Sequence, residues 1–270
     1  MILIRVYSSH SLFLTPLMPS LRIGMGSWVA IDAAANSPSA AAAAIAAAFA
    51  AVSDVEHWMH PQRNGSDLAR INRADLGERL EVRQDTWALL ALAKQINALS
   101  DGVFDPCLPS RPGCLADIEL QAPNVVVCTV PVALDLGGIA KGYAVDQATD
   151  TLTAQGCSAG LVNAGGDVRV FGSQREKLLL RHANGSLSPL HLANAAIAVS
   201  ELDCRGRPSE HQGYYVRGKS LSPRFRHAAV IARNATLADA LVKCVLLCPA
   251  ATTRNLLRVF DAATPTLAIT

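Results

Sequence analysis

The chain has few aromatic and few charged residues for its length, and its charges nearly cancel. Aromatic side chains make up 5% of the 270 residues and charged ones 17%, with a formal net charge of +2. Because no basic patch is interleaved with aromatic residues, the composition gives no support to a nucleic-acid-binding protein. Half of the residues are hydrophobic, which is enough for a sizeable buried core in a chain of this length.

The seven cysteines lack the paired spacings of a structural metal site. Cys244 and Cys248 are four residues apart in a segment with a helical pattern, but no histidine or second cysteine pair accompanies them. We interpret the cysteines as buried or incidental thiols of a protein in a reducing compartment.

The N-terminal segment lacks a long uninterrupted apolar run. Residues 1–19 are apolar, but polar residues at positions 8–11 and two prolines interrupt them. The segment is therefore too polar for a membrane span and lacks the order of a signal peptide. We expect no stable membrane span and a cytoplasmic location. No internal repeat or Pro/Ser-rich linker divides the chain, so we assign residues 1–22 to a poorly defined N-terminal segment and residues 23–270 to one domain.

Periodicity and capping signals predict a single α+β domain of mixed sheets with packed helices. Ser37-Pro38 opens an alanine-rich helix that runs to about Met59. Between Leu108 and Pro131 we expect a loop with one strand. The other expected helices are 66–72, 84–100, 140–155 and 237–247, and the expected strands are 24–31, 125–130, 160–163, 167–171, 178–181, 196–199 and 228–232.

Two glycine-rich segments contain most of the residues that can carry chemistry. Residues 134–146 read Leu-Asp-Leu-Gly-Gly-Ile-Ala-Lys-Gly-Tyr-Ala-Val-Asp, and residues 163–167 read Asn-Ala-Gly-Gly-Asp. Glycine lets the backbone approach a ligand closely, lysine supplies a point charge for phosphate, and carboxylates can hold a divalent cation. Lys141 also follows two glycines at the expected start of a helix, where backbone N–H groups attract anions. The pattern is typical of a diphosphate bound with Mg²⁺.

Five ordered blocks of the sequence resemble the FAD:protein FMN transferases, often called the ApbE family. They are the two glycine-rich segments, Gly102-Val103-Phe104-Asp105-Pro106, residues 66–72 and residues 238–241. The resemblance implies an ApbE-like, T-fold-related architecture. It also implies the family's reaction, in which FMN moves from FAD to a Ser or Thr hydroxyl of an acceptor protein and AMP is released. FAD is then the substrate, Mg²⁺ the cofactor and the acceptor protein the partner.

The resemblance further implies which residues act on the substrate. Lys141 and Asp135 match positions that contact the flavin nucleotide, and we take both as candidates for catalysis. His211 is a third candidate, because a histidine could take the proton of the acceptor hydroxyl. The alternative, a lone surface histidine, is favoured by the sequence, since the family's late histidine motif has no clean counterpart here.

Other positions match the family's flavin-binding pocket. The segment with Val103, Phe104 and Asp105 resembles the one that packs on FAD, and Phe104 offers a face for stacking; its alternative role is in the core. Met25 matches a residue at the border of the pocket. Gln62 stands where the family often has an aromatic residue.

The expected metal site departs from the family's pattern at one position. In the family, Mg²⁺ is held by a backbone carbonyl that matches Gly138 and by an Asp and a Thr four residues apart, of which Asp239 matches the first. Lys243 stands at the threonine position, and a protonated ammonium has no lone pair for a cation. Lys243 either replaces part of the metal's charge or marks a chain that binds flavin without transferring it. Thr236 is an alternative hydroxyl ligand or a helix N-cap.

Two other functions are alternatives to flavin transfer. A non-catalytic FAD-binding protein of the same fold is the alternative that Lys243 favours. An NAD-dependent oxidoreductase would need Gly-x-Gly-x-x-Gly after its first strand, and Val29 occupies the place of the third glycine. We therefore reject the oxidoreductase.

Overall fold

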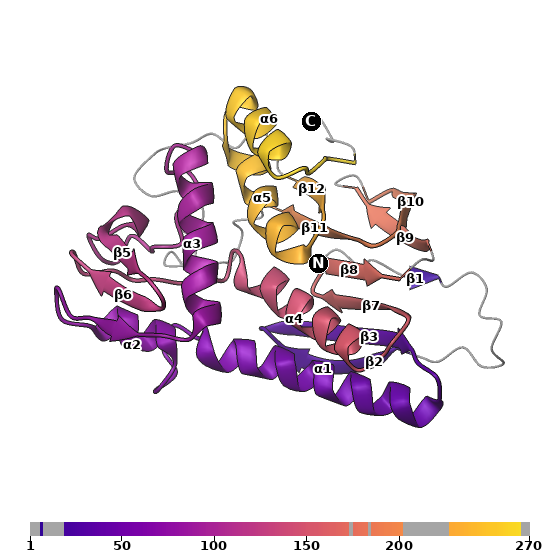
Figure 1. Cartoon of the computed structure of the whole chain (residues 1–270). Coiled ribbons are helices and arrows are strands. Elements are labelled where there is room, and N and C mark those ends of the chain that lie inside the picture. The colour runs from indigo at the N-terminus through magenta and orange to yellow at the C-terminus, as the bar shows by residue number, and fades with distance from the viewer. Residues whose placement is uncertain (1–5, 8–18, 173–174, 183–184, 202–226, 266–270) are drawn as a thin grey trace.

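The centre of the molecule is a six-stranded antiparallel sheet (Figure 1). The computed structural model describes residues 6–7, 19–172, 175–182, 185–201 and 227–265. The strand order is β12–β11–β8–β7–β3–β2. The strands are β2 (Ser20–Gly24), β3 (Ser27–Ala34), β7 (Ala159–Ala164), β8 (Asp167–Phe171), β11 (Ala195–Glu201) and β12 (His227–Ala232).

Three helices cover one face of this sheet: α1 (Pro38–Trp58), α4 (Ala140–Ala154) and α5 (Ala235–Leu247). Residues of β3 alternate between the two faces of the sheet, and Val29 and Ile31 join the helices in the main core. The α1 helix begins as the sequence predicts, because the Ser37 side chain accepts a hydrogen bond from the backbone N–H of Ala40. The main core therefore lies between the central sheet and these three helices, and α4 packs on α5 there.

By length and composition, α1 is apolar enough to cross a membrane. The same test is passed by helices that belong to a protein core. Ile45, Phe49 and Val52 of α1 are buried in the main core, where the helix packs on α4 and β3. The expectation of no stable membrane span is therefore not contradicted.

A smaller sheet, in the order β1–β9–β10, lies on the other side of the central sheet. Its strands are β1 (Val6–Tyr7), β9 (Glu176–Arg181) and β10 (Leu187–Leu192). A second apolar cluster joins the layers and includes Leu178 and Leu192 from the small sheet and Val168 and Ile197 from the central one. The strands β1 and β2 both begin within the range 1–22 that the sequence left poorly defined.

A third sheet lies beside α3, at the left of Figure 1. It is formed by β4 (Leu80–Glu81), β6 (Val125–Cys128) and β5 (Ile118–Gln121), in that order. The helices α2 (Asp67–Arg73) and α3 (Gln84–Leu99) and a 3-10 turn at Leu115–Asp117 belong to the same part of the chain, and α6 (Ala250–Val259) packs on α3 and α5. A β-bridge between Cys107 and Leu134 joins this part to the first glycine-rich segment.

The α+β fold is confirmed, and the differences from the expected elements are local. The strand expected at 24–31 is instead the end of β2, a turn and β3, because Met25 and Gly26 have φ of 53° and 68° and reverse the chain. The expectation of one strand between Leu108 and Pro131 is wrong, since β5 precedes β6 there. The helix α6 and the strand β10 were not predicted.

Candidate functional site

The first glycine-rich segment forms a tight turn that leads into α4. The Oδ1 of Asp135 accepts a hydrogen bond of 2.8 Å from Gly137 N, and the carbonyl oxygen of Leu136 accepts one of 2.7 Å from Ala140 N. The N–H of Asp135 donates to the carbonyl oxygen of Pro106 at 2.9 Å. Asp135 therefore orders the turn and ties it to the segment that contains Phe104.

Lys141, in the first turn of α4, forms an ion pair with Asp167 at the start of β8. Its Nζ lies 2.6 Å from Oδ2 of Asp167, whose side chain is 1% exposed, while the side chain of Lys141 is 24% exposed. Asp167 follows the second glycine-rich turn, so the ion pair brings the two glycine-rich segments together.

The β7–β8 turn also touches the β2–β3 turn. Gly165 has φ of 58°, and a Cβ at this position would lie 2.5 Å from Oγ of Ser27 and 4.0 Å from Cδ of Lys141. Its N–H donates to the carbonyl oxygen of Trp28 at 3.1 Å. Only glycine fits this approach. Met25 lies in the neighbouring β2–β3 turn, where it is partly buried against the main core.

Asp239 enters the site from α5, all of whose residues are buried. Its Oδ2 accepts a hydrogen bond of 3.0 Å from Gly142 N. Its Oδ1 pairs with the ammonium of Lys243, one helical turn further along α5. Lys243 is 5% exposed, so this pair is buried.

Lys141, Asp167, Asp239 and Lys243 form what we call the charged cluster. The pKa of Asp167 is raised from its usual 3.8 to about 6, mainly by burial and secondly by the nearby charge of Asp239. The charges of Lys141 and Lys243 act in the opposite direction. The two ion pairs adjoin each other, because Gly142, the residue after Lys141, donates to Asp239.

The residues present do not fit the Mg²⁺ ligand set expected from the family. Both carboxylate oxygens of Asp239 have protein donors, and Lys243 cannot ligate a cation while it is protonated. Within the described part of the chain, no group of three or more His, Cys, Asp or Glu side chains could hold a metal ion. Gly138 is placed beside Phe104, with 3.8 Å between a Cβ built at Gly138 and Cε2 of Phe104.

The segment with Val103, Phe104 and Asp105 is buried. Val103 and Phe104 belong to the main core. The carboxyl of Asp105 accepts hydrogen bonds from Cys107 N at 2.9 Å and Leu115 N at 3.3 Å, so it orders its own loop.

Two further site candidates are Gln62 and His211. Gln62 is exposed in the turn after α1, and its carbonyl oxygen accepts from Arg73. His211 lies outside the described residues, as does the stretch 209–215 compared with the family's late histidine motif.

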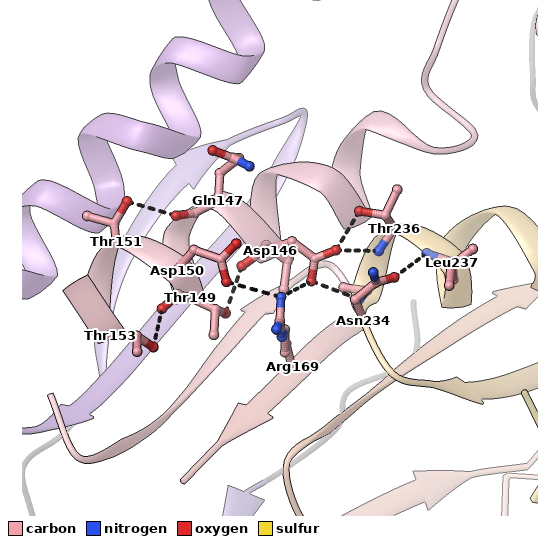
Figure 2. A network of polar contacts seen from close by, with 12 residues as sticks. Asp146, Gln147, Thr149, Asp150, Thr151, Thr153, Arg169, Asn234, Thr236 and Leu237 are labelled. Atoms are coloured by element: carbon pink, nitrogen blue, oxygen red, sulfur yellow. Dashed lines mark hydrogen bonds and ion pairs between the residues drawn. The ribbon is translucent and has the colours of Figure 1, made fainter. Parts of the chain in front are cut away.

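Sequence reasoning missed the role of Asp146, which joins α4 to α5 (Figure 2). Its Oδ1 accepts from Arg169 at 2.8 Å and from Ala235 N at 2.9 Å. Its Oδ2 accepts from the N–H and the hydroxyl of Thr236 at 2.8 and 2.5 Å. The free N–H groups at the start of α5 were the signal that an acceptor was needed.

This network also decides the open alternative for Thr236. The hydroxyl of Thr236 donates to Asp146, and the N-cap of α5 is Asn234, whose side chain accepts from Leu237 N at 2.9 Å. Thr236 is therefore neither the capping residue nor a free hydroxyl beside Asp239.

Glycine turns, a helix start and a lysine next to buried carboxylates meet in one part of this α+β fold, and these are the features that phosphate-binding sites use. The model of the ApbE family matches residues 25–111 and 113–265, and the chain belongs to this family.

The curated relatives that match this chain are all named FAD:protein FMN transferase. An FAD:protein FMN transferase of Vibrio cholerae is 28% identical over 149 residues, which are 46% of this chain and 45% of the relative. One of Rhodobacter capsulatus is 32% identical over 110 residues, which are 41% of this chain and 21% of the relative. The matched region thus spans less than half the length of these relatives.

Solved structures of the family share the fold. The apo form of Pseudomonas stutzeri flavinyl transferase ApbE has a TM-score of 0.78 at 18% identity, covering 94% of this chain and 92% of that one. The Thermotoga maritima ApbE protein has a TM-score of 0.71 at 21% identity, covering 92% and 93%. The predicted architecture is therefore confirmed.

Proposed function

We propose that this chain is an FAD:protein FMN transferase, which moves FMN from FAD to a Ser or Thr hydroxyl of an acceptor protein. The observation that carries the proposal is the position of Lys141. In a chain of the ApbE family, its ammonium is held by buried Asp167 between two glycine turns, at the start of a helix. A lysine in this place can contact a diphosphate together with backbone N–H groups.

In the proposed reaction, the acceptor oxygen forms a bond to the phosphorus on the FMN side of the FAD diphosphate. The bond from that phosphorus to the bridging oxygen breaks, AMP leaves with that oxygen, and the hydroxyl proton passes to a base. FMN stays on the acceptor as a phosphoester. The ammonium of Lys141 offsets negative charge that develops on the transferring phosphate. Asp135 contacts the nucleotide, and His211 is the candidate base.

A dependence of the transfer reaction on Mg²⁺, implied by the resemblance, stays a prediction. When bound, a divalent cation would supply charge stabilisation at the diphosphate. The pairing of Asp239 with Lys243 argues against the ligand set that the prediction assumed. The non-catalytic FAD-binding alternative is not favoured, since the curated relatives that match are all named as transferases.

The test follows the fate of FAD. Purified protein is incubated with FAD, with and without Mg²⁺, and the products are separated by chromatography. Water can replace the acceptor hydroxyl, so we expect slow release of AMP and FMN even without an acceptor protein. Lys141→Ala should lower this rate on the order of 100-fold, the usual effect of removing one group that stabilises the transition state.

The exposed Lys177 on β9 provides the matched control. Lys177→Ala should leave AMP release unchanged. FAD that is retained intact would indicate the non-catalytic alternative. FAD that is neither bound nor cleaved would contradict both.

A further inference from the structure

We propose that this chain binds FAD without a divalent cation, because the ammonium of Lys243 occupies the place beside Asp239 that a metal would take. The inference rests on the proposed function, since it concerns the same diphosphate site. It concerns how the chain supplies positive charge to that site.

The contacts of Asp239 show why a cation is not needed to neutralise it. Its side chain is fully buried, and a buried carboxylate requires hydrogen bonds or a counter-charge. Gly142 N donates to one oxygen and Lys243 pairs with the other. Both requirements are met by the protein itself.

The spacing fixes Lys243 in this place. Residues four apart on a helix lie on the same face, and Asp239 and Lys243 are four apart on α5. Every residue of α5 is buried, so the lysine cannot turn to solvent without leaving its counter-charge. A divalent cation at Asp239 would therefore meet a fixed positive charge at short range and be repelled.

The charge of Lys243 also reaches the diphosphate side of the site. It acts on Asp167, which is in contact with Lys141. An ammonium has three donors, and the pairing with Asp239 uses one. Lys243 can thus serve as a second cation behind Lys141, in the role that a metal ion has in other phosphate sites.

The first experiment measures FAD affinity of the wild-type protein by titration calorimetry, once in EDTA and once in millimolar Mg²⁺. We expect the two dissociation constants to agree within about threefold, because Lys243 already supplies the positive charge beside Asp239 that the metal would add. Titration of Mg²⁺ into the protein without FAD should show no binding heat.

The second experiment changes the ammonium. Lys243→Thr restores a hydroxyl at the family's ligand position and frees one oxygen of Asp239. We expect its FAD affinity in EDTA to fall at least about tenfold, because Asp239 then lacks its counter-charge and repels the diphosphate, and Mg²⁺ to restore it. Lys243→Arg keeps the charge and should bind FAD without Mg²⁺. Lys177→Thr is the same substitution at an exposed lysine of β9 and should match the wild type.

The outcomes separate this inference from the proposed function. Wild-type protein that binds FAD only with Mg²⁺ overturns the inference and leaves the function standing, and this result does not require any variant to fold. Lys243→Thr that binds FAD in EDTA as tightly as the wild type also overturns it. Absence of FAD binding in both buffers overturns the proposed function itself.

Discussion

The carboxyl group of Asp167 is buried beside Lys141 and responds to the charges of Asp239 and Lys243. Burial raises its pKa to about 6, so the folded protein holds this proton more tightly than the unfolded chain does. The resulting contribution to stability is therefore complete below pH 3.8, the usual pKa, and is lost as the pH rises through about 6.

Asp167→Asn should remove this pH dependence. Relative to the wild type, the free energy of unfolding of the variant should rise between pH 4 and pH 7 by at most roughly 3 kcal/mol. Urea unfolding at both pH values measures the change. The control is Asp54→Asn, at an exposed position of α1. If the free energies of unfolding of the wild type and Asp167→Asn differed by the same amount at both pH values, the environment assigned to Asp167 would be wrong.

A second residue-scale prediction concerns Asp146. Its carboxylate accepts from Arg169 and from three donors at the start of α5. Asp146→Asn removes the charge and turns an NH₂ group toward these donors, so we expect a loss of about 3 kcal/mol in the free energy of unfolding. Asp150→Asn is the matched control, since Asp150 also contacts Arg169 but its side chain is 63% exposed. Equal losses in the two variants would count against the bridging role of Asp146.

At the scale of elements, the site depends on how closely α4 crosses α5. A Cβ at Gly142 would lie 2.2 Å from the carbonyl oxygen of Ala235 and 2.8 Å from Cβ of Asp239. Gly142→Ala must therefore push the two helices apart and lengthen the hydrogen bond from Gly142 N to Asp239. We expect a loss of about 3 kcal/mol or more in the free energy of unfolding, measured in urea.

Gly138→Ala is the control for this prediction, because a Cβ there meets only Cε2 of Phe104 at 3.8 Å, an ordinary contact. Its stability should stay within about 1 kcal/mol of the wild type. If Gly142→Ala were as stable as Gly138→Ala, the close crossing of α4 and α5 would be disproved.

Elements with their own local signals could be predicted from the sequence, and the others depend on tertiary neighbours. The cap at Ser37 and the alanine-rich run fixed α1 to within a residue or two. The strand β10 was missed because Pro189 argues against a strand, yet β10 is at the edge of its sheet, where proline is tolerated. In the site, Lys141 and Asp239 lie in recognisable blocks. Asp146 bonds to a residue 90 positions away, which no local pattern indicates.

At the scale of the whole molecule, the charged cluster is assembled from segments that are far apart in the sequence. Lys141 comes from α4, Asp167 from β8, and Asp239 from α5, and the β2–β3 turn adjoins them. A ligand that contacts several of these segments binds only when they are folded together. FAD should therefore stabilise the fold as one unit, by an amount that depends on its concentration.

Thermal unfolding with increasing FAD tests this expectation. At FAD concentrations about 100 times the dissociation constant, the gain of about 2.7 kcal/mol should raise Tm by roughly 5–10 °C in a chain of this size. Lys141→Ala should lose most of the shift, because the proposed FAD site then lacks its main cation, whereas Lys177→Ala on β9 should keep it. A shift of equal size in Lys141→Ala would place the flavin elsewhere on the molecule, since the ammonium that Asp167 holds would then make no contact with it.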